Sequence, residues 1–532
     1  MKKTRVIHPF LFAVFPVLFL YAHNIMYTPA KQIIAPLAVI IPAVILLYLI
    51  LRFFFKDREK AGIALSAFLL LFFAYGHIYE LLNKFHIRIN LGFYLLGPLT
   101  LLLIFFSILF LFIFFFCIRT RRDLHDFTKF LNIAAAILVA ISLFNIGIYA
   151  LRTMNASKKM GTKTAEDKRL NVEKTGYLPN IFYIIMDSYG RKDILKEYFG
   201  YDNTPFLDFL KENGFYVADR TMSNYGRSLL SVTSSLNFQY LDDLSNKVGI
   251  DTESRLPLVK MLNDNRVFKK LKQYGYKTIT FDTSWELIRI KNSDVSYKII
   301  EFDLNLFHSK LLSTTPIPYI LNKMTKLGKF SSPWLINEKY NMIRKRVLFT
   351  FEKLEELSKD KDPFIVFALI LPPHQPFVFD ENGNPIIPDK ESFDLWDSCQ
   401  NEKEREEYRK GYVGHLKFAN KKLRALIPKI LSNSAKPPII IIQGDHGPSS
   451  MMVLRDPVKT NVRERLAILN AYYLPDNGSK LLYETITPVN TFRVILNYYF
   501  GTDYKLLKDE GFYSTWRQVY KFINVTKRVN PE

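Results

Sequence analysis

Cysteine is scarce in this chain, and acidic residues are fewer than basic ones. Cys117 and Cys399 are the only cysteines in 532 residues, which excludes a disulfide framework. Cys117 lies in an apolar run and Cys399 in a charged stretch, and neither has the surroundings expected of a nucleophile. Asp and Glu number 50 against 72 Lys and Arg, so the formal net charge is +22. This excess predicts an anionic neighbour, either a membrane surface or a phosphate-bearing substrate.

Internal repeats, low-complexity tracts and nucleic-acid-binding modules are also missing from the sequence. Nucleic acid is therefore not expected as a partner of this basic chain. Hydrophobic residues make up 49% of the sequence and include 45 Phe, which is high for a wholly soluble protein. Most of the long apolar runs lie in residues 1–151, so this part is predicted to be an α-helical membrane domain.

Five segments of this part are long and apolar enough to cross a bilayer, which needs about 20 mostly apolar residues. We place them at residues 7–23, 33–55, 61–82, 91–118 and 129–151. The first is short and contains Pro16, so its limits are soft. A cleaved signal peptide is the alternative reading of that segment, but no small-residue cleavage site follows it.

Charge in the short loops predicts which ends of the spans face the cytoplasm. The N-terminus, the loop after span two and the loop after span four are rich in Lys and Arg. The alternate loops hold only Lys31 in one case, and Lys84 and Arg88 in the other. Five crossings from a cytoplasmic N-terminus put everything after Leu151 outside. We therefore expect a multi-pass protein of the cell (inner) membrane, with an extracytoplasmic C-terminal domain.

Four polar residues fall at the predicted outer ends of spans one and three: His23, Asn24, His77 and Glu80. Ionisable groups in membrane spans are costly and often functional. These residues either reach water at the membrane interface or line an entry path for a lipid headgroup.

The rest of the chain is predicted to be a polar linker followed by one large domain. Residues 152–177 are polar and lack apolar periodicity, as a linker does. From residue 178 to 532 strands alternate with helices, for example in FLDFLKENGFYVA and VFKKLKQYGYKTITFD, where a glycine ends each helix before a strand. This alternation predicts an α/β domain with a mostly parallel central sheet covered by helices on both faces.

Two apolar strands of this domain end in residues that bind metals. NIFYIIMDSYG ends at Asp187, and PPIIIIQGDHG ends at Asp445 and His446. Runs that are apolar at every position suit strands buried on both faces of a parallel sheet. Ligands of such sheets sit outside the carboxyl ends of the strands. The pair predicts a divalent-metal site, and polar strand-end turns without a metal are the alternative.

The segment SNYGRSLLSVTSSLN supplies a candidate nucleophile. Its polar turn leads into a run that predicts a short helix starting near Ser228. A hydroxyl at a helix N-terminus lies where backbone N–H groups favour an anion, and a metal contact would activate it. Ser228 is our choice, and the nearby hydroxyls that stay open are Ser231, Thr233, Ser234 and Ser235. A serine-rich capped helix without catalytic function is the plainer alternative.

His374 follows another buried strand, in FALILPPHQPFVFDENGNP. Pro373 and Pro376 flank it and stiffen its backbone. Because it also stands at the carboxyl end of a strand, it could bind a substrate anion or protonate a leaving oxygen. A structural hydrogen-bonding histidine is the alternative.

The order of these motifs resembles the sulfatase-like branch of the alkaline phosphatase superfamily. Within it, the chain is similar to membrane-anchored lipoteichoic acid synthases and phosphoethanolamine transferases, which carry five membrane spans before an extracytoplasmic catalytic domain. The resemblance covers essentially the whole chain. It implies that Asp187, Asp445 and His446 bind the metal, that Ser228 is both nucleophile and metal ligand, and that His374 contacts substrate. The transferases usually have Thr at the position of Ser228.

The resemblance also implies the reaction. Such enzymes move a phospho-group, of phosphoglycerol or phosphoethanolamine type, from a membrane phospholipid to a lipid or glycan acceptor through a covalent Ser or Thr intermediate. One divalent metal is implied, usually manganese, zinc, magnesium or calcium. The mixed oxygen and nitrogen ligands predicted here suit manganese or zinc better than calcium.

Three other activities are weighed against this one. A formylglycine-dependent sulfatase needs Pro two residues after the modified residue and Arg two further on, and neither follows Ser228. A phosphodiester hydrolase stays open, because water can replace the acceptor. A non-catalytic membrane-anchored scaffold stays open too, and the sequence leaves the transferred group and the acceptor undecided.

Overall fold

The computed structural model describes residues 5–25, 28, 30–84, 89–90, 95–159, 178–283, 286–299, 306–326, 334–386, 399, 401–453 and 456–531. The chain divides into two compact units. The first, here the membrane unit, contains Met1–Met154 and Phe302–Lys339. The second, here the α/β unit, contains Asn155–Glu301 and Tyr340–Glu532.

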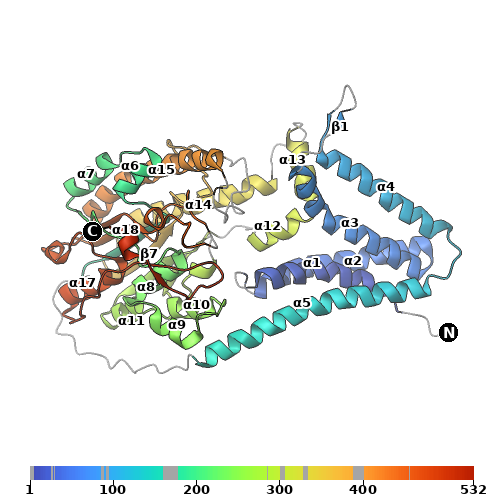
Figure 1. Cartoon of the computed structure of the whole chain (residues 1–532), viewed down its shortest axis with the longest axis horizontal. Helices are drawn as coiled ribbons and strands as arrows, with labels where there is room; N and C mark the ends of the chain where they lie inside the picture. The colour runs from blue at the N-terminus through green and yellow to red at the C-terminus, as the bar shows by residue number, and fades with distance from the viewer. Residues whose placement is uncertain are drawn as a thin grey trace. The chain divides into compact units, whose positions relative to one another are not determined.

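The membrane unit is built from five apolar helices (Figure 1). They are α1 His8–Asn24, α2 Ile34–Phe55, α3 Arg58–Lys84, α4 Pro98–Arg119 and α5 His125–Lys159. Four of these helices, α2 to α5, are long and apolar enough to cross a membrane. The remaining helix, α1, has 17 residues and contains Pro16.

Two predicted boundaries need correction. The fourth span was expected to begin at residue 91, but α4 begins at Pro98, because Ile89–Asn90 and Leu95–Leu96 pair as short antiparallel strands before it. Proline at the first turn of a helix lacks only a donor that would be unpaired there anyway. At the other end of the unit, α5 continues to Lys159, inside the predicted linker, and residues 160–177 lie outside the described part of the chain.

Helix α1 runs parallel to α3 and α5. At its N-terminal end, His8 Nδ1 lies 2.6 Å from Ser66 Oγ of α3, and the His8 N–H donates to Asn132 Oδ1 of α5 at 2.9 Å. At its other end, Tyr21 packs in a cluster with Phe73 of α3 and Ile146 of α5. Along the chain, His8 precedes Tyr21, Ser66 precedes Phe73 and Asn132 precedes Ile146. The three helices therefore run in the same direction.

The division into units differs from the predicted one in one respect. Helices α12 Leu306–Ser313 and α13 Ile317–Lys326 belong to the membrane unit, although their sequence was assigned to the domain after residue 178. The physical reason is that Phe307 and Leu311, one helical turn apart, are buried against Val17 and Tyr21 of α1.

The α/β unit contains a seven-stranded sheet in the order β4-β9-β8-β3-β7-β5-β6. The strands are β3 Ile181–Met186, β4 Tyr216–Val217, β5 Lys277–Phe281, β6 Val295–Tyr297, β7 Phe364–Ile370, β8 Ile439–Gly444 and β9 Asn470–Tyr473. Pairings from β8 to β6 are parallel, whereas β9 and β4 pair antiparallel at one edge. The sheet is thus mostly parallel, as predicted.

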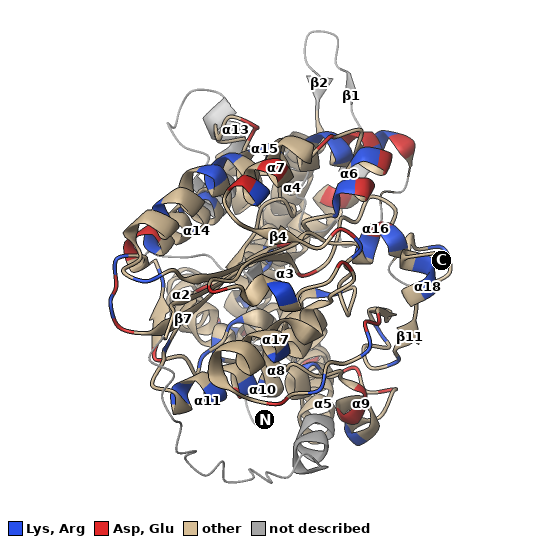
Figure 2. Ribbon diagram, turned by 90° about the vertical axis from the view of Figure 1, so that its left-hand side faces the viewer, with Lys and Arg blue, Asp and Glu red and all other residues tan. Residues whose placement is uncertain are grey.

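Helices cover both faces of this sheet (Figure 1). On one side lie α8, α10, α11 and α17, and on the other α6, α7, α14 and α15. Their bounds are α6 Lys192–Phe199, α7 Thr204–Glu212, α8 Ser228–Asn237, α10 Leu256–Asn263, α11 Arg266–Gln273, α14 Trp334–Leu357, α15 Glu402–Asn433 and α17 Pro488–Phe500. Charged residues of both signs lie along α15 (Figure 2).

Alternation along β3 explains how α8 is held under the sheet. Ile181, Tyr183 and Ile185 share one face of the strand and lie in one buried cluster with Val232 and Leu236 of α8. The Tyr183 hydroxyl also lies 2.6 Å from Ser235 Oγ. This packing fixes the start of α8, which is Ser228 as the sequence predicted, close to the end of β3.

Candidate metal centre and nucleophile

The site is assembled at the carboxyl ends of three adjacent strands. In the sheet β3 lies between β7 and β8, and Met186 pairs with both Ile370 and Gly444. The residues that follow these strands therefore emerge side by side. Asp187 follows β3, Asp445 follows β8, and the backbone N–H of His374, beyond β7, donates to the Asp187 carbonyl at 3.1 Å. The predicted crevice thus forms where parallel strands end in register.

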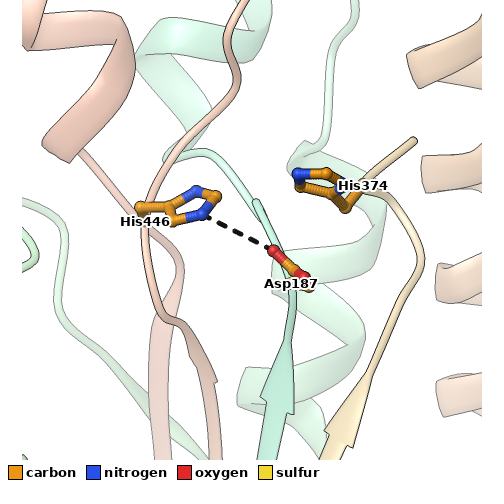
Figure 3. Close-up of side chains that lie close together, drawn as sticks. All are labelled: Asp187, His374 and His446. Carbon is orange, nitrogen blue, oxygen red and sulfur yellow. Dashed lines mark ion pairs between the residues drawn. The ribbon is translucent and has the colours of Figure 1, made fainter. Parts of the chain in front are cut away.

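The side chains of Asp187, His374 and His446 lie close together (Figure 3), and Asp445 also reaches His446. His446 Nε2 lies 3.6 Å from Asp187 Oδ1 and 3.6 Å from Asp445 Oδ2. Both carboxylate oxygens are buried and have no hydrogen-bond partner among the described residues. Buried polar atoms are normally paired, so two unpaired carboxylate oxygens facing one imidazole nitrogen fit a cation.

Ser228 completes this group. Its Oγ lies 3.1 Å from His446 Nε2. Ser228 is the first residue of α8 and follows Arg227, whose backbone is extended, so the helix starts at the hydroxyl. All four sequence-predicted metal ligands are therefore within one cluster.

The tautomer of His446 follows from its second nitrogen. Nδ1 lies 2.9 Å from the Gly447 carbonyl oxygen, which only accepts, so Nδ1 carries the proton and Nε2 presents its lone pair. A metal-ligating histidine is commonly oriented by such a bond. Asp445 is oriented in the same way, because its Oδ1 accepts the N–H groups of Ser188 and His446 at 3.0 and 2.9 Å.

Burial and like charge govern the protonation of the cluster. Burial, and then the charge of Asp445, raise the pKa of Asp187 well above its usual range. Burial also raises the pKa of Asp445, against the opposing effect of the nearby Ser228 hydroxyl. The pKa of His446 is lowered by burial and then by Arg465, which keeps the imidazole neutral. Two carboxylates that resist joint ionisation and one neutral imidazole are what a divalent cation would stabilise.

Arg465 is a functional candidate that the sequence reasoning missed. It is buried behind the cluster, where its Nε donates to the Gly226 carbonyl at 2.8 Å and its Nη1 to the Gly447 carbonyl at 3.1 Å. It therefore joins the loop before Ser228 to the loop after His446. The available signal was a charged residue directly before the apolar run LAIL, a place where burial was foreseeable.

His374 lies beside the cluster. One ligand atom each of Asp187, His374 and His446 lie within 4.8 Å of one another, so His374 could also donate to a metal. Burial lowers the pKa of His374 to about 4, so its imidazole is neutral near pH 7. His415 on α15 holds this loop, since its Nδ1 lies 3.1 Å from the His374 carbonyl and its Nε2 accepts the Val378 N–H at 3.1 Å.

The other candidate hydroxyls of α8 point elsewhere. Ser231 Oγ lies 3.1 Å from Ser223 Oγ, Ser234 donates to the Gln239 carbonyl, and Ser235 bonds to Tyr183. Thr233 is fully buried, and its Oγ1 has no hydrogen-bond partner in the described part of the chain. Ser228 is thus the hydroxyl of the five that contacts the candidate metal ligands.

A small cavity of about 30 Å³ lies beside Asp187. Its walls are the carboxyl ends of β5 and β7 and one side of α14. They combine charged, hydroxyl and apolar groups, including Asp282, Arg346, Thr350 and Leu369. No sequence motif marks α14 as a wall of the site, because the residues of this helix lie far along the chain from every motif.

The chain is similar to a family model and to several solved structures. A family model described as Sulfatase matches residues 179–493, and no curated protein matches the chain by sequence. Among solved structures, the periplasmic domain of EcEptC from Escherichia coli is 14% identical, with 68% of this chain and 94% of that chain covered and a TM-score of 0.40. The lipoteichoic acid synthase LtaP from Listeria monocytogenes is 16% identical, covering 66% and 78%, at a TM-score of 0.35. BT1596, a 2-O GAG sulfatase, is 14% identical, covering 64% and 73%, at 0.38.

The family model spans more than half of the chain, and its limits enclose all five candidate site residues. The chain therefore belongs to the Sulfatase family.

Proposed function

We propose that this protein is a metal-dependent transferase with Ser228 as its nucleophile. It moves a phospho-group, of phosphoglycerol or phosphoethanolamine type, from a membrane phospholipid to an extracytoplasmic lipid or glycan acceptor. The observation that carries the proposal is the 3.1 Å approach of Ser228 Oγ to His446 Nε2, beside two unpaired carboxylate oxygens. Family membership alone does not imply a sulfate ester, because Ser228 lacks the Pro and Arg of the formylglycine motif.

Asp187, Asp445, His446 and Ser228 would hold one divalent metal. When bound, it would lower the pKa of the serine hydroxyl and offset negative charge on the phosphoryl oxygens. Manganese or zinc suits the mixed oxygen and nitrogen donors better than calcium or magnesium.

The chain's own residues then divide the reaction into two steps. In the first, Ser228 Oγ forms a bond to phosphorus and loses its proton, while the glycerol oxygen of the donor leaves and takes up a proton. The N-terminal N–H groups of α8 face the phosphoryl oxygens. In the second step an acceptor hydroxyl attacks phosphoserine and restores Ser228. His374, neutral near pH 7, accepts the acceptor's proton and thus acts as a base in this step.

The residues around the small cavity beside Asp187 are suited to hold part of a substrate next to the metal. Arg346 and Thr350 supply polar contacts for a headgroup, while Leu369 and other apolar residues supply a surface for its carbon atoms. The net charge of +22 favours a membrane that contains anionic lipid as the environment of the donor.

For the membrane unit we propose five crossings with a cytoplasmic N-terminus. Helix α1 contacts Ser66 and Asn132 at one end and packs with Phe73 and Ile146 at the other, so it extends alongside α3 and α5. Its 17 residues span about 25 Å, close to the hydrocarbon thickness of about 30 Å. An odd number of crossings puts the α/β unit outside.

Turnover of defined lipids tests the proposal. The purified full chain is reconstituted in vesicles of phosphatidylglycerol and phosphatidylethanolamine, with manganese or zinc, and diacylglycerol release is measured. We expect release that stops with EDTA and in Asp445→Ala. Release that is faster without an added acceptor, with free headgroup phosphate as product, would identify a hydrolase instead. No release from either lipid, in protein shown to contain metal, would contradict the proposal.

A further inference from the structure

Helices α12 and α13 fold as part of the membrane unit. Along the sequence, however, they lie between β6 and β7 of the α/β unit. We propose that residues 306–326 are a docking segment that seats on the outer ends of α1 and α3, and that this seat is required for turnover of substrates held in the membrane. The second half of this statement rests on the proposed function, and the first half does not.

Helix α12 packs through an apolar face. Phe307 is 4% exposed and Leu311 6% exposed, and both lie in one cluster with Val17 and Tyr21. Beside this cluster, His308 Nε2 lies 3.1 Å from the carbonyl oxygen of Gln32 in the loop after α1. The contact is thus apolar in its centre and polar at its edge, as a specific interface is.

The turn between α12 and α13 meets α3 at a glycine. The Gly76 N–H donates to the Thr314 carbonyl at 2.8 Å. A Cβ atom on Gly76 would overlap the Ser313 carbonyl oxygen, so the two backbones approach closer than any other residue permits. On the same side of α3, the ring of Tyr319 lies 4.2 Å from that of Tyr79. Docking of residues 306–326 therefore requires glycine at position 76.

The positions of these contacts agree with the orientation deduced from loop charge. Tyr21, Gln32, Gly76 and Tyr79 all lie towards the ends of α1 and α3 that the basic loops place outside. A segment from the extracytoplasmic part of the chain can reach only that side of the bilayer. The packing places these contacts at the C-terminal ends of α1 and α3, and the loop charge predicts that these ends face outward.

Docking of residues 306–326 matters for catalysis because of how the chain is connected. The α/β unit is joined to α5 by one connection, and a docked 306–326 adds two more, one before α12 and one after α13. Extra attachments raise the effective concentration of a site relative to the surface that holds its substrate. Turnover of soluble substrate does not need that gain.

Gly76→Leu tests the seat, with Gly147→Leu as matched control, because Gly147 is also in a membrane helix but nothing lies within 4 Å of its Cβ position. Both full-length variants are reconstituted in vesicles. Trypsin added outside should cleave at Lys310 and Lys323 in Gly76→Leu at least tenfold faster than in wild type or Gly147→Leu. Equal protection of Gly76→Leu and wild type would overturn the docking segment, whether or not the protein has lipid activity.

Two substrates then test the consequence. We expect Gly76→Leu to lose at least 90% of lipid turnover and to keep hydrolysis of bis-p-nitrophenyl phosphate and bound metal within twofold of the control. Unchanged lipid turnover in a variant with exposed Lys310 would overturn the proposal. If Gly76→Leu fails to accumulate, Phe307→Ser replaces it, with the exposed Leu348→Ser as control and the same two outcomes.

Discussion

Ser228 Oγ lies 3.1 Å from His446 Nε2, and the same nitrogen lies 3.6 Å from a carboxylate oxygen of Asp187. One imidazole lone pair thus faces a hydroxyl from α8 and a carboxylate from β3. Nothing in their separation along the sequence brings these residues together; the register of β3 with β8 and the packing of α8 on Tyr183 do.

The first prediction concerns the nucleophile. Ser228→Ala should lower lipid turnover by about a thousandfold or more, because no other hydroxyl of α8 faces His446. Ser228→Thr keeps the hydroxyl and should retain at least a tenth of the activity. Metal content, measured by elemental analysis, should stay within twofold in both variants, since three ligands remain. Equal activity of Ser228→Ala and wild type would exclude Ser228 as nucleophile.

The second prediction separates metal affinity from folding stability. Asp187→Asn removes one of two buried carboxylates. Burial raises the pKa of both, and the charge of Asp445 raises the pKa of Asp187 further. In EDTA the variant should therefore be more stable than wild type, by about 2–4 °C in Tm. With manganese or zinc the order should reverse, because the variant has lost a ligand. Thermal unfolding in detergent measures both, and a wild type that is the more stable in EDTA would contradict the prediction.

The third prediction follows from the direction of the same shifts. A carboxyl group whose folded pKa is raised stabilises the fold below its ordinary pKa and loses that contribution as pH rises through the raised value. Metal-free protein should thus become less stable above about pH 4, and metal should restore the loss. The difference in Tm between metal-loaded and EDTA-treated protein should grow with pH from 5 to 8. A difference that shrinks over this range would show that these carboxyls do not bind the metal.

Arg465 and Arg463 form a matched pair for the fourth prediction. Arg463 is partly exposed and pairs with Asp193 and Glu197 on the surface, whereas Arg465 is buried and bonds to the Gly226 and Gly447 carbonyls. Arg465→Met should lower stability by about 3–5 kcal/mol, and Arg463→Met by less than about 1 kcal/mol.

Arg465 is a positioning residue, so its loss should also affect Ser228. Below the Tm of Arg465→Met, the rate of phospho-adduct formation on Ser228 should fall by about a hundredfold at saturating metal, and Arg465→Lys should restore part of it. A variant that is less stable but reacts at the wild-type rate would reduce Arg465 to a structural role.

Much of this account was accessible from the sequence, for identifiable reasons. Apolar runs such as Ile439–Ile442 fix a buried parallel strand, and a strand end fixes where Asp445 emerges. The start of α8 at Ser228 followed from the change from polar turn to apolar period. These signals are local, so they predict only where each residue lies on its own helix or strand.

The features that the sequence did not reveal depend on contacts between distant segments. The position of Arg465 before the run LAIL indicates burial, but its bonds to Gly226 and Gly447 depend on contacts between distant segments. Helix α12 has the composition of any short amphipathic helix, and only its burial against Val17 shows that it belongs to the membrane unit. The start of α4 was missed because an apolar hairpin and an apolar helix have the same hydropathy.

The most direct test of the central claim is mass spectrometry of the full chain after incubation with metal and membrane phospholipid. The account predicts one phosphorus-containing adduct, on the peptide of α8, with fragmentation that places it on Ser228. Its mass would also identify the transferred headgroup. An adduct on Ser231 or Thr233, or no adduct in metal-loaded protein that turns lipid over, would contradict Ser228 as the nucleophile.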